Sequence, residues 1–185
     1  MPTTVDKSIE VSVPVRMAYN QWTQFEEFPK LMGGVEEVRQ IDDRTLHWVA
    51  EIAGVRREWD ATILEQVPDR RIAWIAIDGK TNSGAVEFEP LGTDRTLVRL
   101  HLAYEPEGFV EQAGDKLNIV DRQVGSDLRR FKDFIEGLGS ETGAWRGSIH
   151  EDYGVGARDA EDVATTGGAD IESGDDPDDL TRRSF

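Results

Sequence analysis

The chain has 185 residues, with 37 acidic and 21 basic side chains and a formal net charge of −16. This charge opposes binding to nucleic acid phosphates and to anionic membrane surfaces. Cysteine is absent, which excludes disulfides, thiolate metal sites and cysteine nucleophiles. The apolar stretches are too short to span a membrane, and the N-terminus lacks the pattern of a signal peptide, so we expect a cytoplasmic protein.

The composition changes near residue 140. Residues 140–185 contain twelve acidic and four basic side chains, and so carry half of the net charge. This segment has too few branched apolar residues to offset the entropy lost on ordering. We therefore expect one domain over residues 1–139 and an acidic, disordered tail over 140–185. The tail serves solubility or contacts a protein partner, with Trp145, Tyr153 and Phe185 as its candidate anchors.

The first elements of the domain are a strand and two short helices. Alternating apolar residues from Val5 to Val13 predict a half-buried strand. Pro14 ends this strand and suits the first turn of a helix over 14–23, and a second helical turn follows over 25–32. Six further strands are then predicted between turn residues, over 35–41, 45–53, 55–67, 71–77, 84–88 and 96–104. Their short connections favour antiparallel neighbours.

The last predicted element is a long helix. Apolar residues recur at steps of three and four from Val110 to Leu138, and Gly137 and Gly139 mark the end. A seven-stranded curved sheet must bury one face, and only this helix is large enough to cover it. The predicted fold class is therefore α+β, with an antiparallel sheet curved around a long C-terminal helix. We expect a ligand cavity between the two.

Strand parity indicates which side chains face that cavity. The candidate lining residues are Trp48, Arg57, Trp59, Trp74, Val86, Phe88, Leu100, Leu102 and Tyr104. Parity does not show which way Trp74 faces, because its strand is apolar on both faces. The tryptophans could equally be packed in the core as line a cavity. Arg57 is the one charged member. It either reaches solvent or a carboxylate near its strand end, or orients a polar group of a ligand.

Motifs for phosphate, metal or covalent chemistry are missing. The segment from Asp78 to Thr81 resembles the end of a phosphate-binding loop, but position 74 holds tryptophan where the loop requires glycine. His47, His101 and His150 are far apart and form no metal-binding pair. The sequence therefore predicts no cofactor and no metal site, and it identifies no catalytic residue.

The order of several segments resembles the polyketide cyclase/dehydrase and Coq10-type START-like (SRPBCC) family. The matching segments are residues 9–15 (IEVSVPV), 22–29 (WTQFEEFP), 57–61 (REWDA), 72–74 (IAW), 82–88 (NSGAVEF), 96–100 (TLVRL) and 104–108 (YEPEG). The resemblance covers residues 1–139 and implies a helix-grip (START/Bet v 1-like) fold around an apolar cavity.

Members of this family bind lipids, quinones, polyketides or hormones, and a minority are enzymes. The resemblance therefore implies binding of a hydrophobic small molecule such as a lipid, an isoprenoid quinone or a polyketide. The alternative is an aromatase-type polyketide cyclase/dehydratase acting on a poly-β-ketone chain. In that case Arg57 would hold an enolate or carbonyl oxygen and Tyr104 would transfer a proton.

Overall fold

The computed structural model describes residues 3–52, 54–78, 82–105, 113–150 and 154–156. Its helical elements are α1 (Val15–Trp22), the 3₁₀ turn η1 (Phe25–Glu27), α2 (Phe28–Leu31) and α3 (Ala113–Leu138). Its strands are β1 (Thr3–Val11), β2 (Val35–Gln40), β3 (Thr45–Ile52), β4 (Val55–Val67), β5 (Arg71–Ala76), β6 (Ser83–Pro90), β7 (Thr96–Tyr104), β8 (Ser148–His150) and β9 (Gly154–Gly156).

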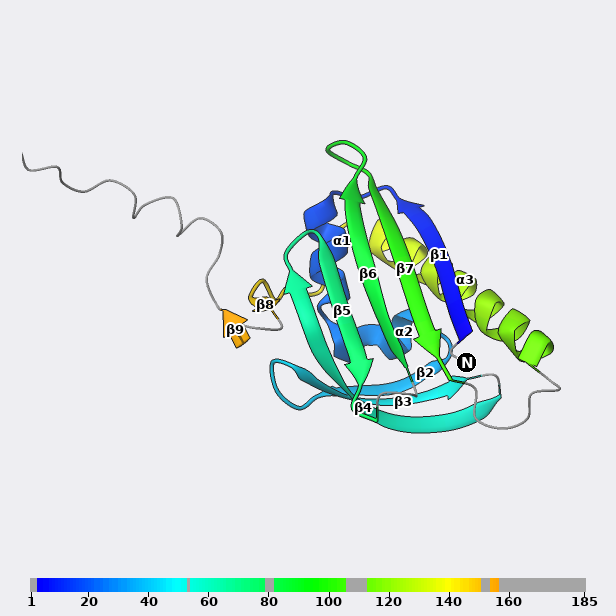
Figure 1. Cartoon of the computed structure of the whole chain (residues 1–185). Coiled ribbons are helices and arrows are strands. Elements are labelled where there is room, and N and C mark those ends of the chain that lie inside the picture. The colour runs from blue at the N-terminus through cyan, green and yellow to red at the C-terminus, as the bar shows by residue number, and fades with distance from the viewer. Residues whose placement is uncertain (1–2, 53, 79–81, 106–112, 151–153, 157–185) are drawn as a thin grey trace, which may run out of the picture.

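The seven predicted strands form one antiparallel sheet in the order β1-β7-β6-β5-β4-β3-β2. The helix-grip architecture is thereby confirmed. Strands β2–β4 turn sharply away from the direction of β5–β7, so that the sheet wraps around the helices (Figure 1). The register of β4 shifts between Ile63 and Glu65. Such a bulge bends a strand and increases its twist, which accounts for part of this curvature.

Helix α3 is tied to the first strand along its length. Lys7 on β1 forms an ion pair with Asp121 at 2.8 Å, and the Lys132 ammonium donates a hydrogen bond to the Glu10 carbonyl oxygen at 3.0 Å. The helix ends at Leu138, and Gly139 follows it with a φ of 69°, in the left-handed region that glycine adopts without strain. These contacts fix α3 across the concave face of the sheet.

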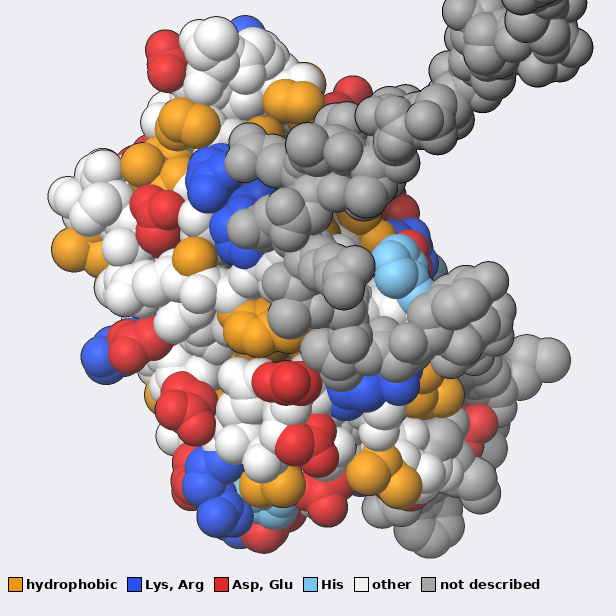
Figure 2. All heavy atoms as spheres, turned by 90° about the vertical axis from the view of Figure 1, so that its left-hand side faces the viewer, with side chains coloured by type: hydrophobic (Ala, Val, Ile, Leu, Met, Phe, Trp, Pro, Cys, Tyr) orange, Lys and Arg blue, Asp and Glu red, His pale blue; other side chains and the backbone are white. Residues whose placement is uncertain are grey.

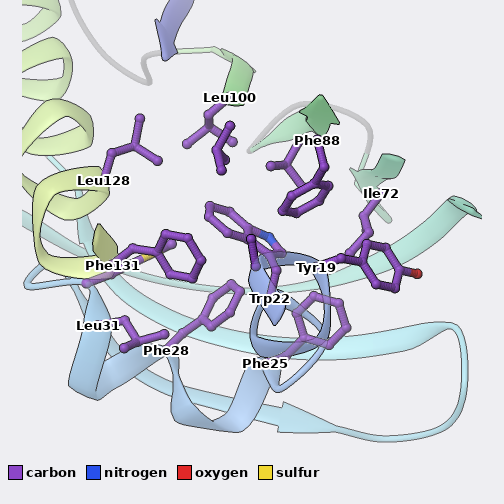
Figure 3. Close-up of a cluster of buried hydrophobic side chains, with 14 of the residues drawn as sticks. Tyr19, Trp22, Phe25, Phe28, Leu31, Ile72, Phe88, Leu100, Leu128 and Phe131 are labelled. Atoms are coloured by element: carbon purple, nitrogen blue, oxygen red, sulfur yellow. The ribbon is translucent and has the colours of Figure 1, made fainter. Parts of the chain in front are cut away.

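The core gathers aromatic rings from the two short helices and the sheet (Figure 3). Trp22 at the end of α1 packs edge-to-face against Phe28, Phe88 and Phe131, with ring centroids 5.1–6.1 Å apart. The edge-to-face arrangement is favourable for aromatic quadrupoles and adds to the burial of area. This cluster fills the end of the interior near α1.

The predicted domain boundary at residue 140 differs from the structure. Residues 141–150 fold back onto the domain, and β8 pairs with the free edge of β4 opposite Gln66. Ile149 is fully buried, and Trp145 packs against the core. We call residues 141–149 the C-terminal strap. The remainder of the predicted tail, apart from 154–156, lies outside the described residues.

Four hydrogen bonds hold the strap to α1 and to Thr23, which directly follows it. Gln21 accepts a hydrogen bond from the backbone of Thr142 at 2.8 Å and donates one to its hydroxyl at 3.1 Å. The Asn20 amide donates to Glu141 at 2.8 Å, and the Thr23 hydroxyl accepts from the backbone of Trp145 at 3.0 Å. Because the side chains of Asn20, Gln21 and Thr23 are buried, the strap satisfies polar groups that water cannot reach.

The surface carries mixed charge. On the face shown in Figure 2, acidic and basic side chains are interspersed and hydrophobic side chains form small separate groups. No helix among the described residues is long and apolar enough to cross a membrane.

Candidate functional site

A cavity of about 330 Å³ lies between the curved sheet and α3. The interior between the sheet and α3 is therefore not packed solid, which agrees with the cavity that the helix-grip prediction requires. The cavity wall is formed by the short helices, by strands β2–β5 and β7, and by residues 119–128 of α3. The aromatic part of this wall consists of Trp22, Phe25, Phe28, Trp48, Trp59, Trp74 and Tyr104.

Six of the nine candidate residues line this cavity. They are Trp48, Trp59, Trp74, Leu100, Leu102 and Tyr104. The structure also resolves the ambiguity at Trp74, which shares the cavity wall with Ile72 two residues earlier. Trp74 is held there by a hydrogen bond that its indole nitrogen donates to the Asn82 side-chain oxygen at 3.0 Å.

The other three candidates lie outside the cavity wall. Val86 and Phe88 on β6 are buried in the core, and Phe88 packs edge-to-face against Tyr19 and Trp22. They share the inward face of the sheet, but the aromatic cluster around α1 fills the space before them. Arg57 is half-exposed near the start of β4, opposite Ala50.

Several wall residues were missed by strand parity because they come from other elements. The short helices supply Trp22, Phe25 and Phe28, and the turn after α2 supplies Gly33 and Gly34. Helix α3 supplies Ile119, Val120, Gln123, Val124, Asp127 and Leu128. Val120, Val124 and Leu128 belong to the predicted stripe, whereas Ile119 does not. Gln123 and Asp127, four residues apart, border it as a polar pair.

Trp48 and Trp59 form a stacked pair within the wall. They are direct partners in the register of β3 and β4, and their ring planes lie 6° from parallel with centroids 6.0 Å apart. Neither indole nitrogen has a hydrogen-bond partner among the described residues, and the same holds for the Tyr104 hydroxyl. Burial raises the pKa of Tyr104, so this phenol stays neutral at pH 7, where its hydroxyl can donate or accept a hydrogen bond.

Asp127 is the buried carboxylate of the cavity wall, with 9% of its surface exposed. Its Oδ1 accepts hydrogen bonds from the Gly33 backbone and from the Gln123 side chain, both at 2.9 Å. Burial raises the pKa of Asp127, and these two hydrogen bonds and the charge of Arg130 offset part of that effect. No Lys, Arg or His among the described residues lies within ion-pair distance of it.

The cavity reaches the surface beside Asp127. Its wall there includes the exposed residues Gly33, Glu51, Gly54 and Ile119, the last 49% exposed. The Gly34 carbonyl accepts a hydrogen bond from the Glu51 backbone at 2.8 Å, which joins the turn after α2 to the end of β3. We call this end of the cavity the mouth.

No group of three His, Asp or Glu side chains within the described residues is arranged to hold a metal ion. The cavity has a largely apolar wall with a few hydrogen-bonding groups. A wall of this composition buries a hydrophobic molecule and orients it through a small number of polar contacts.

A curved antiparallel sheet gripping a long C-terminal helix around a cavity defines the helix-grip, START-like class. Within that class, the family model described as "Polyketide cyclase / dehydrase and lipid transport" matches residues 11–136, and the chain belongs to this family. Its fold is thus one shared by hydrophobic-ligand-binding proteins and polyketide cyclases.

Individual proteins resemble the chain in sequence or in fold. The chain is 51% identical over 146 residues to an uncharacterized 17.2 kDa protein of Streptomyces lincolnensis, a match that covers 78% of this chain and 97% of the relative. Its structure is similar to that of the Zhui aromatase/cyclase from a Streptomyces species, with a TM-score of 0.65 and 15% identity over 78% of this chain and 100% of that chain. A START superfamily protein from Mycobacterium smegmatis has a TM-score of 0.63 and 17% identity, over 73% of this chain and 98% of that chain.

Proposed function

We propose that the protein binds a hydrophobic small molecule, such as a lipid, an isoprenoid quinone or a polyketide, in the cavity between the sheet and α3. The observation that carries this proposal is a wall built mainly from aromatic and aliphatic side chains around about 330 Å³ of space. Ligand cavities in proteins range from about 300 to 1,000 Å³, so this one would enclose a small ligand.

The first test is whether the purified protein carries a guest. Native mass spectrometry and solvent extraction of freshly purified protein should reveal a bound hydrophobic compound. The empty protein should bind the neutral probe N-phenyl-1-naphthylamine. A protein that is reproducibly empty and binds no hydrophobic probe would refute the proposal.

A cavity-filling variant makes the test specific to this site. Val124→Trp places an indole within the wall contributed by α3 and should weaken probe binding at least tenfold. Leu138→Trp makes the corresponding change on the same helix at an exposed position outside the wall, and should leave probe binding unchanged. Equal probe affinity in the two variants would place the binding site elsewhere.

A second candidate function is polyketide cyclisation and dehydration, which the position of Tyr104 favours. Its buried, neutral phenol lines the cavity and is able to donate a proton to an oxygen of a poly-β-ketone chain. Arg57 lies outside the wall and so supports this reaction less well. The test is the product profile of a poly-β-ketone substrate with Tyr104→Phe. An unchanged profile would remove Tyr104 from any such mechanism.

A further inference from the structure

The ionisable side chains of the cavity wall are all acidic within the part of the chain that the structure describes. They are Glu36, Glu51 and Asp127, apart from the neutral Tyr104. Glu36 pairs with Arg56, whose Nε lies 3.0 Å from its carboxylate and whose Nη1 lies 3.7 Å from Glu58. Glu51 and Asp127 form no ion pair with any described residue. The negative charge that remains is therefore concentrated at the mouth.

Asp127 is built as a binding group. Gly33 and Gln123 both donate to Oδ1, which fixes the orientation of the carboxylate, while Oδ2 accepts no hydrogen bond from the described residues. A Cβ atom at Gly33 would lie 2.5 Å from Nη1 of Arg130, so the exposed Arg130 guanidinium lies close to this turn. Oδ2 is not one of the fully buried, unpartnered polar atoms of the described residues, so it is accessible to a polar group that enters the mouth.

We propose that the cavity is selective for amphipathic amines, with an ammonium group at the mouth against Asp127 and an apolar body among the inner tryptophans. This inference rests on the proposed binding function. Hydrogen bonds between an ammonium and a carboxylate are roughly twice as strong as neutral ones, and burial strengthens them further. The exposed carboxylate of Glu51 adds attraction at the entrance.

The same arrangement disfavours anionic guests. A fatty carboxylate or a phosphate head would lie beside Asp127 and Glu51, and no Lys, Arg or His lines the described wall to receive it. Arg130 is exposed, its guanidinium lies close to Gly33, and its charge acts on Asp127, so it offsets part of the repulsion. The cavity thus discriminates by the sign of the head group as well as by apolar area.

The experiment compares three ligands with the same chain and different heads. Decylamine is protonated at pH 7, decanol is neutral and decanoate is ionised. Titration calorimetry on the full-length protein, with each ligand kept below micelle formation, should give affinities in the order amine, alcohol, carboxylate. We expect at least a tenfold difference between the first and the last. Equal affinities, or tighter binding of decanoate, would overturn the inference.

Variants connect the preference to Asp127. Asp127→Asn keeps an oxygen that can accept from Gly33 and Gln123 but removes the charge. The variant should lower the affinity for decylamine about tenfold and change the affinity for decanol less than twofold. Glu51→Gln, at the exposed rim, should have a smaller effect in the same direction. The matched control is Asp121→Asn, an aspartate of the same helix outside the wall, which should change neither affinity.

The outcomes separate this inference from the proposed function. If the neutral probe and all three ligands fail to bind, the binding function itself is wrong. If they bind but the preference for the amine is absent in the native protein, only the head-group inference is wrong. A preference that persists in Asp127→Asn would equally contradict the role given to Asp127.

Discussion

Arg146 and Asp69, which are 77 residues apart, form a two-point ion pair with distances of 2.9 Å from Nη1 to Oδ1 and 2.8 Å from Nη2 to Oδ2. Asp69 holds its carboxylate at a turn in which its own φ is 62°, a conformation that aspartate adopts more readily than most residues. Arg146 also donates to Asn20 at 2.7 Å and lies over the ring of Tyr19. This residue therefore joins the strap to the β4–β5 turn and to α1.

Replacing Arg146 should destabilise the domain. Its side chain is 19% exposed, so Arg146→Ala leaves Asp69 and Asn20 short of their partners in a partly dry environment, and we expect a loss of about 2 kcal/mol in the free energy of unfolding. Arg146→Lys keeps the charge but loses the two parallel hydrogen bonds, so its free energy of unfolding should lie between those of the native protein and Arg146→Ala. Urea unfolding measures the effect. The exposed Arg129→Ala serves as the control, and an equal effect in both variants would contradict this role.

The folded domain should extend beyond residue 140. Ile149→Ala removes a fully buried side chain at the β4 edge and should cost about 2–5 kcal/mol. A chain that ends at residue 139 loses the whole strap and should unfold at lower urea than one that ends at residue 156. If the two shortened chains have the same midpoint, the strap is dispensable for stability.

Phe88 and Trp59 should respond differently to truncation, although parity places both on the inward face. Phe88→Ala opens a hole in the aromatic core and should cost about 3–5 kcal/mol, with little effect on the affinity for the neutral probe. Trp59→Ala removes a residue that already borders empty space, so it should cost less stability and weaken probe binding more. Thermal unfolding and probe titration of both variants would distinguish the roles, and a reversed pattern would contradict the assignment of core and wall.

The stability of the protein should depend on pH through Asp127. Because burial raises the pKa of Asp127, the folded state keeps a proton over a range in which the unfolded chain has lost it. The contribution of this group is therefore most favourable below the ordinary carboxyl value and declines as the pH rises through the raised pKa. Arg130 is the charged group that acts on it, and Glu36 and Glu51 are the other charged residues of the described cavity wall.

The variant Asp127→Asn isolates this contribution. It has no charge to bury, so its free energy of unfolding should exceed that of the native protein increasingly as the pH rises, and the difference should then stay constant. Urea unfolding of both proteins from about pH 3.5 to about pH 8 measures it. A difference that is flat, or that shrinks with rising pH, would contradict burial as the dominant cause.

Local pattern was sufficient to predict the main elements of the fold. The alternation from Val5 to Val13 and the helical stripe of α3 arise because one face of each element is buried. That periodicity appears in the sequence whichever other elements cover the buried face. Parity placed Phe88 on the correct side of the sheet. It could not show that Trp22 and Tyr19 fill the space in front of that residue, because position along the cavity depends on packing between distant elements.

The strap and the mouth could not be predicted for a similar reason. Ile149 stands alone in a polar, glycine-rich segment, so its burial follows from an open strand edge on β4 rather than from its own neighbours. The hydrogen bond from Gly33 to Asp127 joins residues 94 positions apart. Gln123 and Asp127 were visible only as polar residues beside an apolar stripe, a pattern that is also typical of a solvated helix face.

Four of the five tryptophans of this chain, Trp22, Trp48, Trp59 and Trp74, belong to the cavity wall. The near-ultraviolet absorption and emission of the protein therefore originate largely from chromophores that a guest would touch. Occupancy should be readable without any label, from quenching or a spectral shift of the native indoles. The fifth, Trp145 in the strap, provides an internal reference whose surroundings a guest does not reach.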